Sequence, residues 1–221
     1  MCEEEGRLTR RHAIIGLMTI QKPQAFVFLG RYGAGKGTQS RLLIETLRKL
    51  NPARGVVDIE TGAEFRQFID SENYTASLSK AVVERGDLMP EFMPVYLWAR
   101  KMVANYTGVE HLVFDGTPRL LMEAKVLASL FPFYGLGKPW VIYLDVDHDE
   151  SVKRLALRAR TSGRRDDSPA ALVERKRAYE EGVLPTIEWY RQQEAVIFLD
   201  IDGKRPIEEI HADIVKRLGL A

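Results

Sequence analysis

The stretch AFVFLGRYGAGKGTQ, residues 25–39, joins an apolar run to a glycine-rich turn and then to the start of a helical pattern. It nearly repeats the phosphate-binding loop G-x-x-x-x-G-K-[ST], with Gly30, Gly35 and Lys36 in register. A glycine-rich turn between a buried strand and a helix directs backbone N–H groups inward, where the helix N-terminus also attracts anions. The stretch therefore predicts a nucleotide phosphate site.

The residue after Lys36 departs from this pattern. A Ser or Thr there normally ligates Mg²⁺, but Gly37 occupies the place and Thr38 follows one position late. The metal must then be held in another way, most simply through water fixed by a carboxylate. Asp115 follows the apolar run Leu112–Phe114 in HLVFDG, and we expect it to hold Mg²⁺ through water.

Five short apolar runs recur along the chain, with helical stretches between them. Uninterrupted apolar runs are typical of strands that are buried on both faces. The pattern predicts a three-layer α/β/α fold of the P-loop NTPase type, with a five-stranded parallel sheet. We expect one domain over residues 23–221 and a loosely ordered extension over residues 1–22. The expected strands are Ala25–Leu29, Val56–Ile59, Leu112–Phe114, Trp140–Val146 and Ala195–Ile201.

Composition excludes several classes of function. The 221 residues carry a formal net charge of +1, so nothing global attracts the chain to nucleic acid or to an anionic membrane. The single cysteine, Cys2, rules out a disulfide framework and a thiolate zinc site. We expect a cytoplasmic monomer without zinc. The histidines have no metal-ligand spacing, and we expect surface or helix-packing places for His12, His111, His148 and His211.

Six arginines stand beside turns and predicted strand ends. The guanidinium group binds phosphate through two parallel hydrogen bonds. Each arginine alone is equally compatible with a solvated basic face balanced by nearby carboxylates. Six around one phosphate loop favour an anion site instead. They are Arg66, Arg119, Arg154, Arg158, Arg164 and Arg175.

Taken in order, these motifs resemble the adenylate kinase branch of the nucleoside monophosphate kinases. GRYGAGKGTQ is similar to that family's G-x-P-G-x-G-K-G-T-Q, which has the same glycine after lysine. TGAEFR (61–66) resembles the acceptor motif T-G-x-x-x-R, and GDLMP (86–90) resembles G-x-L-V-P. DGTPRLLMEA (115–124) is similar to D-G-F-P-R-x-x-x-Q-A, and TSGRRDD (161–167) to the short lid. The resemblance runs from residue 25 to about residue 217.

The resemblance implies MgATP as the phosphoryl donor. Lys36 would bridge the β- and γ-phosphates, the loop amides would cradle them, and Arg154 would lie against the donor adenine. A short lid over about residues 159–168 would close on the site, with Asp166 and Asp167 orienting its arginines. The implied ATP-binding residues are Gly33, Ala34, Gly35, Lys36, Gly37, Thr38, Arg154 and Arg158.

The resemblance also implies a nucleoside monophosphate acceptor, bound by a mobile segment over about residues 61–90. Arg66 and Arg119 would hold its phosphate. The implied acceptor residues are Thr61, Gly62, Arg66, Leu88, Met89, Gly116, Arg119, Glu123, Arg164 and Arg175. The implied catalytic residues are Lys36, Arg119, Arg158, Arg164 and Arg175.

Four residues depart from the family pattern. Tyr32 replaces the loop proline, a change that we expect to affect rigidity more than chemistry. Ala63 replaces an aspartate that helps hold the Mg²⁺ waters, and Thr117 replaces an aromatic residue. Glu123 replaces the glutamine that reads the acceptor adenine.

The acceptor base stays open at this point. A carboxylate only accepts hydrogen bonds, so Glu123 suits the two donors of guanine, whereas Thr61 resembles the adenine-accepting branch. We predict AMP first, with GMP and CMP as alternatives. A further alternative is a catalytically weak ATP-binding sensor or assembly factor.

Overall fold

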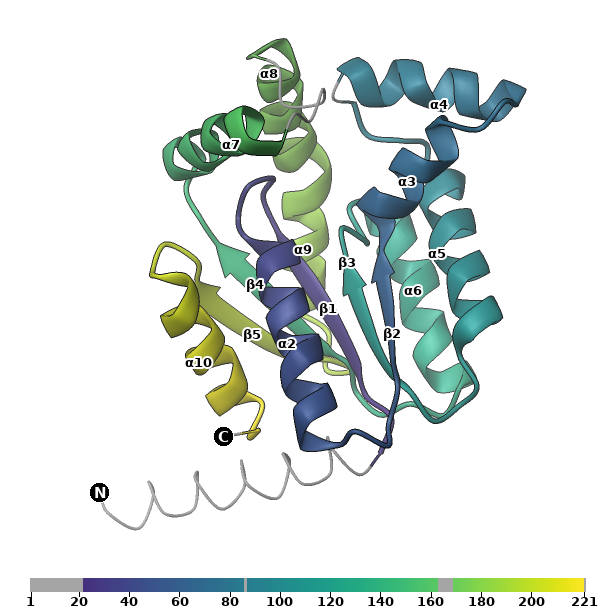
Figure 1. Cartoon of the computed structure of the whole chain (residues 1–221), viewed down its shortest axis with the longest axis vertical. Coiled ribbons are helices and arrows are strands. Elements are labelled where there is room, and N and C mark those ends of the chain that lie inside the picture. The colour runs from purple at the N-terminus through teal and green to yellow at the C-terminus, as the bar shows by residue number, and fades with distance from the viewer. Residues whose placement is uncertain (1–21, 86, 163–168, 221) are drawn as a thin grey trace.

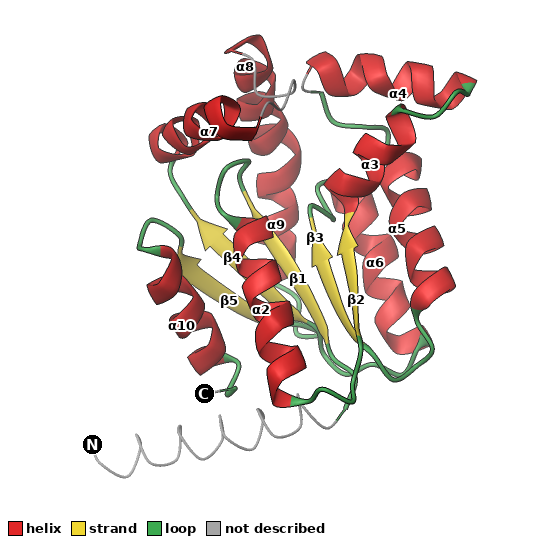
Figure 2. Ribbon diagram, viewed as in Figure 1, coloured by secondary structure: helices red, strands yellow, loops and turns green. Residues whose placement is uncertain are grey.

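A five-stranded parallel sheet forms the centre of the molecule, in the strand order β2-β3-β1-β4-β5 (Figure 2). The computed structural model describes residues 22–85, 87–162 and 169–220. The expected strands are confirmed, with small shifts at their ends. They are β1 (Ala25–Gly30), β2 (Val56–Glu60), β3 (His111–Asp115), β4 (Trp140–Asp145) and β5 (Ile197–Asp202).

Helices connect the strands and cover both faces of the sheet. The three helical segments α8, η2 and α9 follow one another without a break, and η2 is a π-helical turn. The helices are α2 (Lys36–Leu50), α3 (Thr61–Ile69), α4 (Tyr74–Arg85), α5 (Phe92–Asn105), α6 (Leu121–Phe133), α7 (His148–Ser162), α8 (Pro169–Ala178), η2 (Tyr179–Val183), α9 (Leu184–Arg191) and α10 (Ile207–Arg217).

Two apolar cores, one on each face, make the architecture three-layered. Successive residues of β1 point to opposite faces, so Phe26 packs with the α2 and α10 side chains that include Leu43 and Ile214. Val27 points the other way and packs with α5, α6 and α9, which contribute Leu127 among others. The predicted α/β/α layering is therefore confirmed.

Two groups of helices extend beyond the carboxyl ends of the strands. Figure 1 shows α3 and α4 on one side and α7 and α8 on the other. The central strand β1 pairs with β3 so that Phe28 lies opposite Asp115. The loop after β1 and the turn after β3 are consequently neighbours at this edge of the sheet, where the strand order reverses and ligands bind in folds of this kind.

One histidine expectation is wrong. His111 is neither on the surface nor in a helix: it begins β3 and is only 1% exposed. Its ring accepts a hydrogen bond from the Gln24 N–H at Nδ1 over 3.2 Å. Residues 111–115 of the strand are all buried. The polar ring lies in the core because His111 belongs to this strand.

Three predicted site residues, Arg164, Asp166 and Asp167, lie outside the described residues, as does nearly all of the predicted extension 1–22. None of the helices in the described ranges is both long enough and apolar enough to cross a membrane.

Candidate active site

A cleft with a volume of about 1220 Å³ opens at the carboxyl edge of the sheet. It collects the predicted site residues from the loop after β1, from α3, from the turn after β3 and from α7 and α8. Every predicted site residue in the described ranges lines it: Gly33, Ala34, Gly35, Lys36, Gly37, Thr38, Thr61, Gly62, Arg66, Leu88, Met89, Asp115, Gly116, Arg119, Glu123, Arg154, Arg158 and Arg175.

Two glycines of the phosphate loop lie at positions where a side chain would be strained or crowded. Gly35 caps the N-terminus of α2 with a φ of 96°, in the left-handed region that other residues avoid. A Cβ on Gly37 would lie 3.1 Å from the Asp115 Oδ2 atom. A serine or threonine after Lys36 would require the Asp115 carboxylate to shift by a few tenths of an ångström, whereas glycine leaves it in place. The loop is specialised for Asp115 as its neighbour.

Lys36 is held by the loop that it follows. Its Nζ donates to the carbonyl oxygens of Gly30 and Arg31, each at 2.8 Å. Burial lowers the pKa of Lys36 to about 8, although the Asp115 carboxylate opposes this shift. The ammonium group is therefore positioned for an anion and loses water at a cost that a bound phosphate would offset.

Asp115 is a buried carboxylate at the end of β3, with 7% of its surface exposed. Burial raises its pKa and Glu60 adds to the effect, whereas Lys36 opposes it. A carboxylate that has lost most of its own hydration is a suitable acceptor for the waters of a hydrated divalent cation. Among the described residues no three His, Cys, Asp or Glu side chains gather as a metal cluster, and Mg²⁺ needs none because it usually keeps several waters and binds substrate phosphates.

Arg119 follows the cis Thr117–Pro118 peptide and is held at both ends. Its Nε donates to the Gly116 carbonyl oxygen at 2.9 Å, and its Nη1 donates to the Tyr32 phenol oxygen at 2.9 Å. Burial disfavours the charge, but Tyr32, Glu123 and Asp115 outweigh it, and the pKa of Arg119 is raised. The guanidinium group is a permanent cation with a fixed direction.

Glu123 is 1% exposed, and both of its oxygens are already engaged. Oε1 accepts from the Thr117 hydroxyl, while Oε2 accepts from the N–H groups of Arg119 at 2.7 Å and Leu120 at 3.5 Å. Burial raises the pKa of Glu123, and these hydrogen bonds oppose the shift. The carboxylate therefore braces the turn that carries Arg119, in addition to facing the cleft.

The acceptor side begins with Thr61, the first residue of α3. Thr61 is 1% exposed, and its hydroxyl makes no hydrogen bond within the described part of the chain. Arg66 pairs with Glu60 at 2.9 Å and stays 41% exposed, so its guanidinium can move to a ligand. Glu64, next to Ala63, instead pairs with Lys101 at 2.7 Å, and it is not among the residues that line the cleft.

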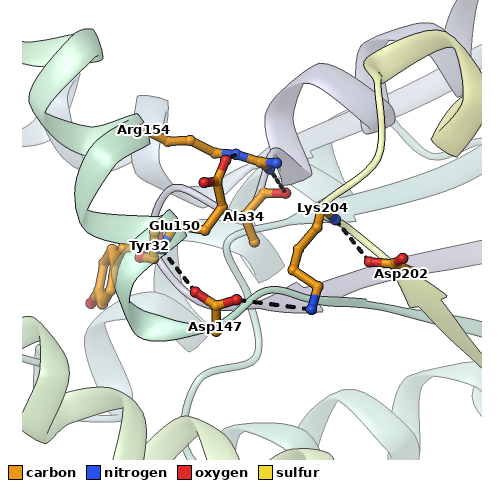
Figure 3. A network of polar contacts seen from close by, with 8 residues as sticks. Tyr32, Ala34, Asp147, Glu150, Arg154, Asp202 and Lys204 are labelled. Atoms are coloured by element: carbon orange, nitrogen blue, oxygen red, sulfur yellow. Dashed lines mark hydrogen bonds and ion pairs between the residues drawn. The ribbon is translucent and has the colours of Figure 1, made fainter.

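Arg154 ties α7 to the phosphate loop, as Figure 3 shows. Its Nε donates to Glu150 Oε1 at 2.8 Å, and its Nη1 lies 3.5 Å from the Ala34 carbonyl oxygen. Arg158, one turn further along α7, and the buried Arg175 of α8 line the same cleft. The basic residues predicted from separate motifs thus converge.

Tyr32 is the functional residue that sequence reasoning missed. Its phenol oxygen binds Arg119, and the Arg119 and Arg175 guanidinium carbons lie 5.0 and 4.6 Å from its ring centroid. The expectation that this residue affects rigidity more than chemistry did not foresee these contacts, and it stays a prediction. The signal available in the sequence was that Tyr32 lies inside the phosphate loop, between Gly30 and Gly35.

Comparison with known proteins identifies relatives over most of the chain. The sequence model of the family described as Adenylate kinase matches residues 28–195. The adenylate kinase of Leifsonia xyli subsp. xyli is 33% identical over 192 residues, which cover 87% of this chain and 92% of that protein. The adenylate kinase of Thermus thermophilus is 30% identical over 197 residues, covering 89% and 98%. That of Xylella fastidiosa strain 9a5c is 32% identical over 193 residues, covering 87% and 98%.

Proposed function

The chain belongs to the adenylate kinase family, and we propose that this nucleoside monophosphate kinase transfers the γ-phosphoryl group of ATP to AMP, forming two ADP. One observation carries the proposal: Lys36, Arg119, Arg158 and Arg175 converge on a single cleft beside the buried carboxylate of Asp115. Phosphoryl transfer spreads charge over the equatorial oxygens, so alignment and electrostatic stabilisation supply most of the catalysis.

On the donor side, residues 33–38 cradle the ATP phosphates with backbone amides and the N-terminus of α2. Lys36 binds the β- and γ-phosphates, and Arg154 lies near the donor adenine. Asp115 would hold the water shell of Mg²⁺, and a metal bound there would supply positive charge to the ATP phosphates. Arg158, Arg164 and Arg175 stabilise the phosphoryl group in transfer, while Asp166 and Asp167 orient lid arginines.

On the acceptor side, Arg66 and Arg119 bind the AMP phosphate. An ionised phosphate oxygen is already a nucleophile, so the reaction needs no general base. The unsatisfied hydroxyl of Thr61 supports a direct contact with the adenine. The residues that complete the acceptor site are Gly62, Leu88, Met89, Gly116 and Glu123.

GMP or CMP as the acceptor is not favoured, since the relatives are adenylate kinases. The engagement of both Glu123 oxygens supports this choice, because a carboxylate bound to Thr117 and to the backbone has less capacity to read guanine. We further propose a mobile acceptor segment over about residues 61–90, a lid over about residues 159–168, and a monomer located in the cytoplasm.

Product formation tests the proposal. ADP is measured from MgATP with AMP, GMP or CMP, using the wild-type protein, Lys36→Ala and the control Lys49→Ala, whose exposed lysine lies at the far end of α2. We expect turnover with AMP, a loss on the order of 10³-fold in Lys36→Ala and little change in Lys49→Ala. ATP binding without turnover on any acceptor would support the sensor, and a preference for GMP or CMP would reassign the acceptor.

A further inference from the structure

Tyr32 contacts two arginines that come from distant parts of the chain. It belongs to the loop after β1, whereas Arg119 follows β3 and Arg175 lies on α8. The phenol oxygen accepts from Arg119 Nη1 at 2.9 Å, and both guanidinium groups lie within 5.0 Å of the ring centroid. One tyrosine side chain therefore meets both cations before any substrate arrives.

The two arginines need such a neighbour. Guanidinium groups stay charged at every physiological pH and repel one another. Arg175 is only 6% exposed, so water screens this repulsion poorly. The negative face of an aromatic ring attracts a cation, and a phenol oxygen accepts a hydrogen bond. Tyr32 supplies both and offsets part of the repulsion, in addition to the Glu123 and Asp115 carboxyl groups near Arg119.

Tyr32 is itself held in place by α7. Its carbonyl oxygen accepts from the Ser151 hydroxyl at 2.5 Å. At the next residue, Gly33, an added Cβ would lie 2.9 Å from the Ser151 carbonyl oxygen and 3.0 Å from Leu155 Cγ. The backbone on both sides of the ring thus packs closely against α7. Figure 3 shows Tyr32 beside Glu150 of α7, which accepts a hydrogen bond from Arg154.

We propose that Tyr32 is a positioning residue for phosphoryl transfer: its hydroxyl aligns Arg119 for the acceptor phosphate, and its ring holds Arg175 for the phosphoryl group in transfer. This inference rests on the proposed function. Preorganised donors lower the barrier because they need no reorientation during the reaction. The family motif has proline at this position, so the device belongs to this chain's own loop.

The test separates hydroxyl from ring. Tyr32→Phe removes only the hydroxyl, and Tyr32→Leu also removes the ring. The control pair is Tyr96→Phe and Tyr96→Leu, because Tyr96 also has an arginine over its ring, Arg100 at 5.6 Å, but lies outside the cleft. We measure kcat, the KM for AMP, the KM for MgATP and the melting temperature.

For Tyr32→Phe we expect a KM for AMP raised about fivefold, with the KM for MgATP within about twofold. Tyr32→Leu adds a fall in kcat of about tenfold, because Arg175 loses its platform. The melting temperatures stay within a few degrees, and the Tyr96 variants keep wild-type kinetics. A residue that merely supported the loop would lower both affinities together with the melting temperature, and that result would overturn the proposal.

A double-variant cycle tests the route through Arg119. If Tyr32 acts through the Arg119 guanidinium, Tyr32→Phe changes the KM for AMP little once Arg119→Lys is present. Full additivity of the two changes would overturn the proposal. An active wild-type enzyme with unchanged Tyr32 variants contradicts only the role of Tyr32, whereas a wild-type protein that forms no ADP contradicts the proposed function itself.

Discussion

The two ends of strand β3 bury titratable side chains in different electrostatic surroundings. At the amino end, His111 is 1% exposed, and burial lowers its pKa to about 4, so the ring is neutral at pH 7. At the carboxyl end, Asp115 is 7% exposed and lies near the partly buried cations Lys36 and Arg119. The strand has five residues, so the surroundings change within one short element from those of a neutral ring to those of a carboxyl group beside two cations.

The difference reflects what each end has to do. A buried polar group without a ligand is less costly when it is neutral. His111 accepts at Nδ1 from the Gln24 N–H, whereas its Nε2 atom has no hydrogen-bond partner among the described residues. At the carboxyl end, charged side chains are held in fixed positions because the phosphates of a substrate bind to them and compensate their charge. Charge is therefore buried where a ligand can compensate it, and the folded state bears that cost in the absence of substrate.

Of the changes that bear on this comparison, Glu123→Leu is expected to have the largest effect on activity, because it leaves the Arg119 N–H and the Thr117 hydroxyl without their acceptor. Because misplacing a catalytic group slightly costs up to about 10²-fold, we expect kcat/KM for AMP to fall by about that factor. Glu123→Gln is the matched variant, since its amide can accept from Arg119 and donate to Thr117. We expect it to change AMP kinetics less than about threefold.

Steady-state kinetics of both variants provide the measurement. If Glu123→Leu were as active as Glu123→Gln, the hydrogen bonds that Glu123 accepts from Thr117 and from the Arg119 N–H would have no role in activity. A switch of Glu123→Gln toward another acceptor base would instead make this residue a base reader.

A smaller effect follows from pH. Burial lowers the pKa of Lys36 to about 8, so its ammonium group loses its proton as the pH rises through this value. We expect kcat/KM for MgATP to fall about tenfold per pH unit above that pKa, because a neutral amine binds phosphate poorly. At saturating MgATP the bound phosphates keep the proton on Lys36, so kcat should begin to fall only at a higher pH than kcat/KM does. Lys36→Arg stays charged, so its kcat/KM should not fall with rising pH in this range. A wild-type kcat/KM that stays constant up to pH 9.5 would contradict the assignment of the fall to Lys36.

The smallest effect on activity is expected at the amino end, where His111→Asn keeps an acceptor for the Gln24 N–H. At pH 7.5 we expect kcat and both KM values within about twofold of wild type. Stability responds instead. The folded pKa of His111, about 4, lies below the ordinary 6.5, so the unfolded chain binds the extra proton first. This contribution to stability is complete above pH 6.5 and is lost as the pH falls from 6.5 to about 4.

Urea unfolding at pH 7 and pH 4.5 measures this loss. Protonation of His111 should destabilise the wild type by up to about 3 kcal/mol over this interval, beyond what other groups contribute in both proteins. The free energy of unfolding of His111→Asn should fall by correspondingly less. Equal acid sensitivity of the two proteins would show that the amino end is not the neutral, proton-excluding region described here.

Local patterns were enough to predict the layers and some residues of the cleft, and the resemblance to a known family predicted the others. Apolar runs interrupted by helical periodicity predicted five parallel strands because buried parallel strands tolerate few polar residues. Positions such as Lys36, Asp115 and Arg119 were found because each lies at a fixed offset from a strand end. The carboxyl ends of neighbouring parallel strands meet at one edge, so motifs far apart in sequence were expected to meet there as well.

What the tertiary structure alone decided is how these side chains engage one another. Tyr32 and Arg119 are separated by 87 residues, and no local pattern states that a phenol will meet a guanidinium across the cleft. The closeness of Gly37 to Asp115 and the engagement of Glu123 by Thr117 likewise depend on how β1, β3 and α6 pack. Residue type and periodicity determine which face a side chain occupies, whereas its contacts depend on distances of a few tenths of an ångström that only packing sets.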